Sequence, residues 1–338
     1  YNGFEVKEML ILAKSVLGLM LGFVLSLVAA VILIPLLKKL HVGQSVSKLI
    51  NERHLKKDGT PTIGGLIFII PTILIMLILY LRGSIEFNSN LIILIFVFLA
   101  YGALGFIDDF LKVKYHNNNG LSIGVKFLLQ TAIAVVFYII YRNNGGDSNL
   151  VISSLGINVS LGWAFGLFIL LVLVGTTNAV NISDGLDGLA GGLSVVAIMA
   201  YGVIAWGSKW ISGYQEIAIF AFVLCGAILG FLVFNTHPAK VFMGDTGSLA
   251  LGGALATIAI LTKHELSLLL IGGVFVVETL SSAIQIIAIR KFHKKVFLKA
   301  PLHHHFEELG WEETDIVKLF WVVGLFLAMI GIIYGVWL

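Results

Sequence analysis

The chain has 338 residues, of which 58% are hydrophobic and only 12% are charged, and its formal net charge is +3. Because soluble globular chains carry about 25% charged residues, this composition excludes a soluble globular protein and favours a polytopic membrane protein. The only cysteine, Cys225, lies in an apolar run. Neither an internal disulfide nor a cysteine-based zinc site is therefore expected.

Ten apolar runs approach the length of about 20 residues that a helix needs to cross a bilayer. They are 10–37, 63–81, 90–107, 122–141, 161–178, 188–206, 216–234, 247–262, 267–289 and 316–338. The first run is too long for the apolar part of a signal peptide, so we interpret it as a retained first span. The sequence therefore predicts an all-α polytopic integral membrane protein with about ten transmembrane helices, forming one domain over residues 1–338.

The basic residues predict the orientation of these helices. If the loop after the first run lies in the cytoplasm, most of the 22 Lys and Arg residues lie on the cytoplasmic side, as such residues generally do. The outer side then holds Lys7, Lys14, Arg82, Arg142, Lys209 and Lys263. In this topology both termini face outward.

Two segments outside the runs have patterns of their own. Residues 142–160 contain NNGGDSN followed by the alternating LVISSLGINVSL, which predicts a small β-hairpin on the outer face. After the ninth run, hydrophobic and basic residues interleave over Arg290–Lys299. This interleaving predicts an amphipathic helix that lies at the cytoplasmic surface.

Polar residues of the kinds that carry chemistry gather in five connections, all on the cytoplasmic side. These are ERHLKKDGTPTIGG, GFIDDF, TTNAVNISDGLDGLAGG, FNTHPAKVFMGDTGSL and KAPLHHHFEELGW. Asp108 and Asp109 directly follow an apolar run, where two adjacent negative charges are costly unless something compensates them. The outer loops have no comparable density of Asp, Asn and His.

Each cluster also has an ordinary structural explanation. The aspartate pair could begin a solvated loop, DGLDG could be a turn, and MGDTGSL could cap a helix. Asp184 and Asp187 are three residues apart, so a helix starting there would place both carboxylates on one face. Three adjacent histidines are poorly placed to bind one zinc ion, which favours anion contact or proton transfer as their role.

Carboxylates gathered on one face repel each other unless a cation lies among them, and their oxygens suit Mg²⁺. Lysines in the same connections add positive charge for an anionic ligand, namely Lys57, Lys112, Lys114 and Lys240. No nucleoside-triphosphate phosphate loop is present. The residues therefore predict the handling of a diphosphate by metal and lysine.

The combination of LGFIDD, NAVNISDGLDGLA, FNTHPAKVFMGDTGSLALGG and PLHHHFE resembles the polyprenyl-phosphate phospho-sugar transferases over nearly the whole chain. The stretch PLHHHFE is similar to the muramoyl-pentapeptide branch of that superfamily. The resemblance implies transfer of phospho-MurNAc-pentapeptide from UDP-MurNAc-pentapeptide to undecaprenyl phosphate, forming lipid I and UMP for peptidoglycan synthesis. It also implies Mg²⁺ as cofactor, the bacterial inner membrane as location with the site on its cytoplasmic side, a possible homodimer, and no nucleic acid partner.

The resemblance also implies roles for individual residues. The catalytic group is Asp108, Asp109, Asp245 and His303, with Asp245 as the metal ligand. The substrate-binding group is Lys57, Thr62, Asn181, Asp184, Asp187, Asn235, Phe242, Gln285, His304 and His305. The amphipathic helix predicted after Gln285 would wall a groove for the prenyl tail.

Three alternatives stay open at this stage. Either aspartate of the pair could contact the carrier phosphate, and the reaction could be a direct attack, which we favour, or pass through an aspartyl phosphate. The rival class is a transporter or channel, which would carry ionisable residues near the membrane midplane and repeated halves. Glu278 is the one such residue in a span, and we expect it to have a polar partner.

Overall fold

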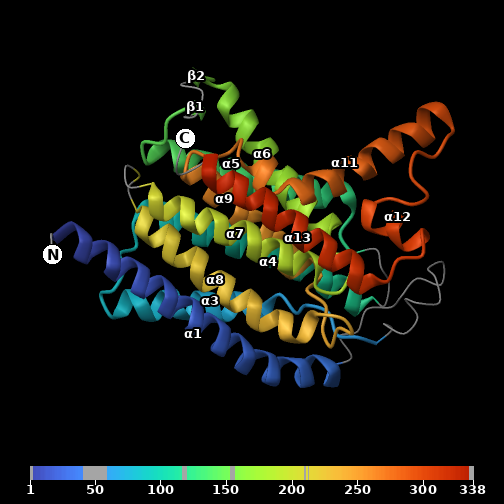
Figure 1. The fold of residues 1–338 in the computed structure, drawn as a ribbon, viewed down its shortest axis with the longest axis horizontal. Helices are drawn as coiled ribbons and strands as arrows, with labels where there is room; N and C mark the ends of the chain where they lie inside the picture. The colour runs from blue at the N-terminus through green and yellow to red at the C-terminus, as the bar shows by residue number, and fades with distance from the viewer. Residues whose placement is uncertain are drawn as a thin grey trace.

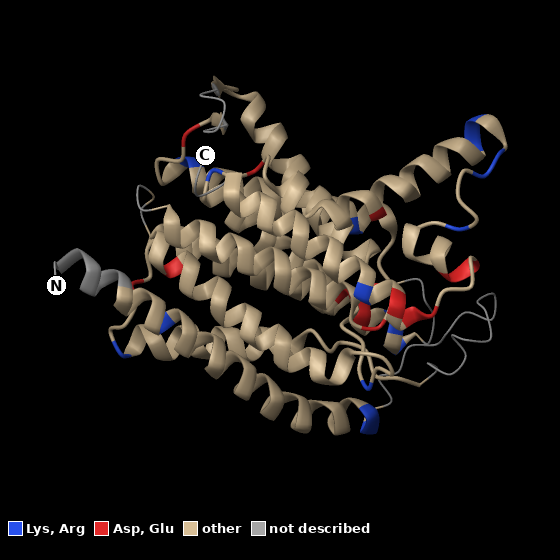
Figure 2. Cartoon of the chain, in the orientation of Figure 1, with Lys and Arg blue, Asp and Glu red and all other residues tan. Residues whose placement is uncertain are grey.

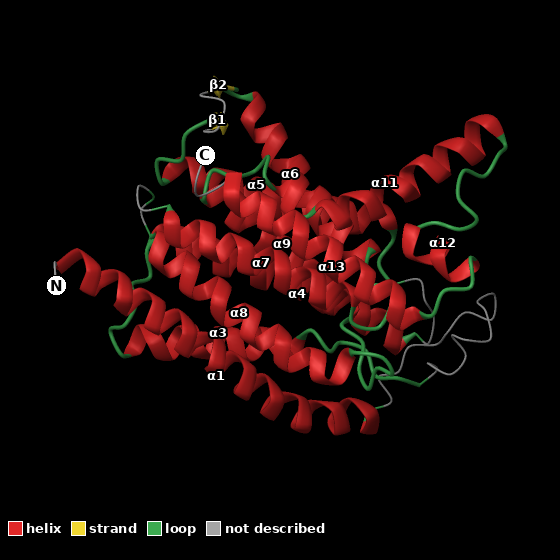
Figure 3. Ribbon diagram, in the orientation of Figure 1, coloured by secondary structure: helices red, strands yellow, loops and turns green. Residues whose placement is uncertain are grey.

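The computed structural model describes residues 3–40, 59–115, 120–152, 157–208, 211 and 213–334. Helices make up nearly all of its regular structure, and the strands are confined to one short hairpin (Figure 3). The elements are α1 (Gly3–Lys39), α3 (Leu66–Leu81), α4 (Ser89–Lys114), α5 (Ile123–Asn143), β1 (Asn149–Ile152), β2 (Ile157–Ser160), α6 (Ala164–Ile182), α7 (Leu189–Gly207), α8 (Tyr214–Asn235), α9 (Gly244–Leu261), α10 (Leu268–Ile271), α11 (Gly273–Ile287), the π-helix η2 (Ala288–Phe292), α12 (Leu302–Glu308) and α13 (Glu313–Ile332).

This architecture confirms an all-α polytopic membrane protein. Within the described residues, nine helices are long and apolar enough to cross a membrane, and η2 extends the α11 span to Phe292. The tenth predicted span corresponds to α3, which is apolar but has only 16 residues. Each of the ten apolar runs thus became a helix, because continuous apolar side chains favour burial of a helix in lipid or among other helices.

α9 lies at the centre of the bundle, and 94% of its most apolar window is buried inside the protein. Its many small residues allow close approach of the neighbouring helices. A Cβ atom at Gly252 would lie 2.5 Å from the Cα of Thr177 on α6, and one at Gly105 on α4 would lie 2.0 Å from the carbonyl oxygen of Asp245. Glycine at position 105 is therefore what brings the end of α4 against the start of α9.

The two ends of the bundle differ in character. α1 begins and α13 ends at the end that carries the hairpin, whereas α12 and the loops that flank it lie at the opposite end (Figure 1). β1 and β2 pair antiparallel with Asn149 opposite Ser160 and Ile152 opposite Ile157. The predicted hairpin is thus formed, and it lies at the end of the bundle opposite α12 (Figure 1).

The predicted amphipathic helix over Arg290–Lys299 is wrong. The helix continues from α11 only through η2, and His293 then turns the chain with a φ of 53°. Gln285 explains the change, because its Oε1 accepts the backbone N–H groups of Val296 and Phe297 and its Nε2 donates to the carbonyl of Phe297. Backbone groups held by this side chain cannot also join a helix ladder.

The turn between α9 and α10 holds a buried carboxyl group. Glu265 is 3% exposed, and neither of its carboxylate oxygens has a hydrogen-bond partner in the described structure. Burial raises the pKa of Glu265 to about 7. Beside it, Lys263 pairs with Asp147 at 2.6 Å and donates to the hydroxyl of Tyr141 at 2.6 Å, which ties this turn to the segment before the hairpin.

We expect a Glu265→Gln variant to be more stable than the parent, and increasingly so as pH rises. An unfolded glutamate ionises near pH 4.3, so between about 4.3 and 7 the folded state holds a proton that the unfolded state has lost. Stability therefore falls as pH rises through this window, by roughly 4 kcal/mol when the loss is complete.

The check is thermal unfolding of both proteins in detergent at pH 5 and pH 8. The advantage of Glu265→Gln should be small at the lower pH and large at the higher pH. Glu86→Gln, in an exposed loop at the same end, is the control and should behave as the parent. An equal gain for Glu265→Gln at both pH values would contradict the assignment.

Candidate active site

The aspartate pair lies on the last turns of α4, which extends to Lys114, beyond the end of the predicted span. Asp108 and Asp109 are 2% and 3% exposed. Because the helix continues for this extra turn, Lys112, four residues after Asp108, lies on the same helix face. Its Nζ lies 2.6 Å from Asp108 Oδ2. Asp108 Oδ1 accepts the backbone N–H of Leu121 at 2.7 Å. Lysine and a backbone amide thus compensate the first aspartate.

The second aspartate serves the start of α9. Asp109 Oδ1 accepts the N–H of Asp245, and Asp109 Oδ2 accepts both the N–H and the hydroxyl of Thr246, at 2.6–3.0 Å. The first N–H groups of a helix lack partners within the helix, so a carboxylate there both satisfies them and complements the helix dipole. Gly244, with a φ of +72°, leaves room for this contact, since a Cβ there would lie 2.4 Å from Asp109 Oδ2.

Asp245 is the centre of the charged network, with 13% of its side chain exposed. Its Oδ2 lies 2.9 Å from Lys112 Nζ and 2.5 Å from Lys126 Nζ, the latter on α5. Its Oδ1 accepts a hydrogen bond of 2.6 Å from Asn181 on α6, and the same amide contacts Ser248. Four helices therefore meet at this one carboxylate.

The three aspartates fit a divalent cation. One oxygen from each of Asp108, Asp109 and Asp245 lies within 4.8 Å of the others. Two lysines face three carboxylates, so one negative charge remains when all are ionised. Mg²⁺ typically uses one or two carboxylates together with water and phosphate oxygens, so Asp245 and Asp108 suffice as ligands. The oxygens of Asp109 already accept three hydrogen bonds from the start of α9.

A cavity of about 520 Å³ opens beside this acidic centre. Its walls come from α4, α5, α6 and the segment before α5. The polar wall consists of Asp108, Lys112, Lys126, Gln130 and Asn178, and the apolar wall of Leu121, Ile123 and Phe127. Ile123 and Phe127 are 90% and 58% exposed, so the apolar wall continues onto the outer surface of the bundle. A charged head and an apolar tail could therefore occupy the same cavity.

Glu278 has the polar partner that its place in a span required. Its Oε2 lies 2.6 Å from His303 Nδ1, and its Oε1 accepts the N–H of His303 at 3.0 Å. Both side chains are buried, and His303 Nε2 has no hydrogen-bond partner in the described structure. That nitrogen faces Gly185 of the α6–α7 loop, where a Cβ would lie 2.3 Å from it.

The same α6–α7 loop also contacts α13 and the α8–α9 loop. Asp187 Oδ2 lies 3.1 Å from His237 Nδ1 and accepts the N–H of Ala239, while the N–H of Asp187 donates to Glu313 Oε1. Residues 181–188 therefore connect three groups: the acidic centre through Asn181, the histidine segment through Gly185, and α13 through Asp187.

The predicted binding residues near α9 lie in its preceding loop and in the segment before α3. Asn235 is buried and donates to the carbonyl of Val241, which closes the α8–α9 loop. The N–H of Phe242 donates to the carbonyl of Pro61. Thr62 is 6% exposed, and its hydroxyl lies beside Gly244. These residues border the start of α9, one residue before Asp245.

The remaining predicted residues are divided between α12 and α11. His304 Nδ1 lies 2.5 Å from Glu307 Oε2, and burial lowers the pKa of His304 despite that contact. His305 Nδ1 accepts the N–H of Leu298 at 3.2 Å. Gln285 holds residues 296 and 297, as described above, so its amide is engaged away from the acidic centre. Asp184 is half-buried in the α6–α7 loop.

Two of the predicted lysines lie apart from the carboxylates. Lys114 lies over the ring of Tyr115 and Lys240 over the ring of Phe234. Lys57 falls outside the described residues. Sequence reasoning missed Lys126, whose ammonium group lies on Asp245 and which stands three residues into α5. A lysine at the cytoplasmic start of an apolar helix was the available signal.

The fold and the acidic centre are those of a multi-pass membrane enzyme. Its charged site, which suits anionic groups, lies next to an apolar surface. A family model described as glycosyl transferase family 4 matches residues 91–263, which include the aspartate pair and Asp245. Curated phospho-N-acetylmuramoyl-pentapeptide-transferases are similar over nearly their whole length. The chain therefore belongs to glycosyl transferase family 4 and, within it, to the phospho-N-acetylmuramoyl-pentapeptide transferases.

The similarity extends over both chains in each comparison. The relative from Geobacillus sp. (strain WCH70) is 47% identical over 96% of this chain and 98% of its own. The relative from Bacillus subtilis (strain 168) is 47% identical over 95% and 97%, and that from Halalkalibacterium halodurans is 46% identical over 95% and 98%. These relatives support a bacterial inner-membrane location. They do not support the homodimer that the resemblance implied.

Proposed function

We propose that this chain carries out the reaction for which its relatives are named. It transfers phospho-MurNAc-pentapeptide from UDP-MurNAc-pentapeptide to undecaprenyl phosphate, forming lipid I and releasing UMP. Its identity of 47% to such a transferase over 98% of that relative's length carries this proposal. The acidic centre supports it, because Asp245 and the two lysines lie where a charged site meets an apolar cavity wall. Residues 1–338 act as a single transmembrane transferase domain with the site facing the cytoplasm.

The reaction joins two anions, so the main barrier is charge repulsion. Mg²⁺ held by Asp245 and Asp108 would supply positive charge to the diphosphate. Lys112 and Lys126 now neutralise the same two carboxylates, and they are placed to contact phosphate oxygens when substrates bind. Asn181 fixes Asp245 through its second oxygen and so holds the orientation of the ligand.

Asp108 is the member of the pair that we assign to the carrier phosphate. Asp108 lines the cavity, and one of its oxygens contacts the mobile ammonium group of Lys112, whereas both oxygens of Asp109 accept hydrogen bonds from the start of α9. A carrier phosphate is largely ionised at neutral pH, so it needs positioning more than a strong base. Its oxygen attacks the phosphorus of the phospho-sugar, the new P–O bond forms, and the bond to UMP breaks. Isolation of a labelled phospho-enzyme in the absence of carrier would contradict this direct route.

The histidine segment is the second part of the proposal. His303, with Nδ1 held by Glu278 and Nε2 facing the α6–α7 loop, is oriented toward the loop that carries Asp184 and Asp187. We assign the surface around His303 to binding of the nucleotide sugar and refer to it as the wall. Its other residues are His304, His305, Asn235, Phe242, Thr62 and Lys57. Gln285 supports the wall by fixing residues 296 and 297 rather than by touching substrate.

The test is UMP release from UDP-MurNAc-pentapeptide in detergent with undecaprenyl phosphate and Mg²⁺. We expect release to need all three additions and to stop when the metal is chelated. Asp245→Asn should lower the rate by about 10²–10³-fold, the usual cost of losing a key electrostatic group. Ser248→Ala removes a hydroxyl that accepts from Asn181 and donates to the carbonyl of Gly244, but it leaves every carboxylate and lysine in place; it is the matched control and should retain most activity. Release from UDP-GlcNAc in place of the muramoyl substrate would contradict the assigned branch.

A further inference from the structure

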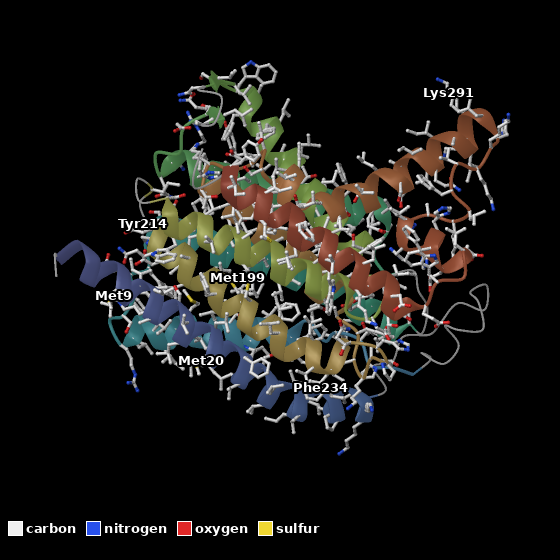
Figure 4. The ribbon with its side chains drawn as sticks, in the orientation of Figure 1. Met9, Met20, Met199, Tyr214, Phe234 and Lys291 are labelled. Carbon is white, nitrogen blue, oxygen red and sulfur yellow. The ribbon has the colours of Figure 1, made fainter. Side chains whose placement is uncertain are left out.

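The structure contains a projection whose basic side chains have no role in the proposed reaction. α11 and η2 extend away from the bundle, and the chain turns back at their tip toward α12 (Figure 1). We refer to residues 288–299 as the hook. Lys291 lies at its tip with its side chain directed outward (Figure 4).

Within the described part of the chain, no carboxylate forms an ion pair with the basic side chains of the hook. Its cations are Arg290, Lys291, Lys294, Lys295 and Lys299, whereas no Asp or Glu occurs in the chain between Glu278 and Glu307. None of the five forms an ion pair with a described residue, in contrast to Lys112 and Lys126 at the acidic centre. Figure 2 shows basic residues at the tip and the acidic ones elsewhere. The charge is therefore available to a partner.

Large apolar side chains are exposed between these cations. Those of the hook are Ile289, Phe292, Val296 and Leu298, which are 43–62% exposed. On the α11 side, Ile286 and Ile287 are 50% and 56% exposed. A soluble anion would leave these side chains in water, and nucleic acid would not cover them, whereas the boundary between headgroups and acyl chains accommodates apolar and basic groups together.

The position of the hook fits the same boundary. It continues a helix that is long and apolar enough to cross a membrane, so its tip comes at the level where that helix leaves the hydrocarbon. Gln285 fixes its shape by holding the backbone of Val296 and Phe297, and the ring of Phe297 packs against His305. The cations therefore project from a structured segment.

We infer that the hook binds the headgroups of anionic phospholipids in the leaflet on the side of the acidic centre. The ammonium and guanidinium groups contact the lipid phosphates, and the interleaved apolar side chains enter the upper acyl region. Charge complementarity selects anionic over zwitterionic lipid, and each basic residue near an anionic surface contributes up to about a fivefold preference at moderate salt. This binding is independent of the transfer reaction.

The experiment uses the full-length protein in nanodiscs with a fluorophore on Phe292→Cys; Cys225 is fully buried and does not compete for the label. Spin-labelled phosphatidylglycerol or phosphatidylcholine is added as a minor component, and quenching gives the relative association of each lipid with the hook. We expect phosphatidylglycerol to be preferred, and the preference to shrink when salt rises from about 0.1 M to about 1 M.

Two charge variants separate the hook from the rest of the surface. Lys291→Gln/Lys294→Gln/Lys295→Gln should lower the lipid preference by up to about fivefold for each lysine removed. Lys38→Gln/Lys39→Gln/Lys318→Gln removes the same charge from other exposed positions and should keep the preference. UMP release in detergent should be unchanged in both variants, which shows that they are folded.

Three results would overturn the inference. They are equal quenching by the two lipids in the parent, an unchanged preference in the hook variant, and an equal loss in the control variant. A higher KM for UDP-MurNAc-pentapeptide in the hook variant with unaltered lipid preference would also overturn it, and would assign the hook to the soluble substrate. Failure of the transfer assay itself would leave the quenching measurement intact, so the two proposals can fail separately.

Discussion

An Asp109→Asn variant is expected to lose about 1.5–3 kcal/mol of stability, because the charged acceptor at the start of α9 is removed. Three hydrogen bonds from Asp245 and Thr246 end on this carboxylate, which is almost fully buried. Asparagine keeps one acceptor and places an amide group against backbone N–H groups. Thermal unfolding in detergent, with UMP release measured below the transition, gives both quantities.

Asp108→Asn is the matched comparison, one residue away on the same helix. Its carboxylate contacts Lys112 and lines the cavity. We expect it to retain more stability than Asp109→Asn and to lose more activity. If Asp109→Asn unfolded like the parent but lost all transfer activity, then Asp109 rather than Asp108 would contact the reacting groups.

Glu278→Leu is expected to destabilise the protein by about 1–3 kcal/mol for each buried hydrogen-bond donor that it leaves without a partner. The change removes both acceptors of His303, leaving its Nδ1 and backbone N–H without partners inside the protein. Since His303 is 1% exposed, water does not replace them. The melting temperature and UMP release should fall together.

A double variant tests whether the loss comes through the pair. Adding His303→Phe to Glu278→Leu removes the orphaned histidine, so the second substitution should cost less than it does alone and recover part of the stability. Ser281→Ala, also buried on α11 but bonded to a backbone carbonyl, is the control and should cost little. Strict additivity of the two substitutions would contradict the coupling between Glu278 and His303.

The sequence by itself determined the membrane class and the location of every span. Each apolar run became a helix because hydropathy and length are local properties that the bilayer selects directly. Even α3, the shortest, followed its run from Leu66 to Leu81. The hairpin was also predictable, since its alternation and turn residues lie within one short segment.

The sequence also predicted which polar clusters share one end of the bundle, because the topology alone places alternate loops together. It could not predict their pairings. Lys126 and Asp245 are far apart in the chain, and Glu278 and His303 belong to different elements. Only the packing of α4, α5, α6 and α9 around small residues such as Gly105 brings such partners into contact.

The hook and the aspartate pair show the same limit. The interleaved pattern over residues 290–299 predicted a helix, but the side chain of Gln285 accepts hydrogen bonds from the backbone N–H groups of Val296 and Phe297, eleven and twelve residues away, and so prevents it. Asp108 and Asp109 are adjacent in sequence, yet neighbours on a helix point about 100° apart. One therefore reaches the lysines and the cavity, and the other reaches the start of α9, a division that only the tertiary structure decided.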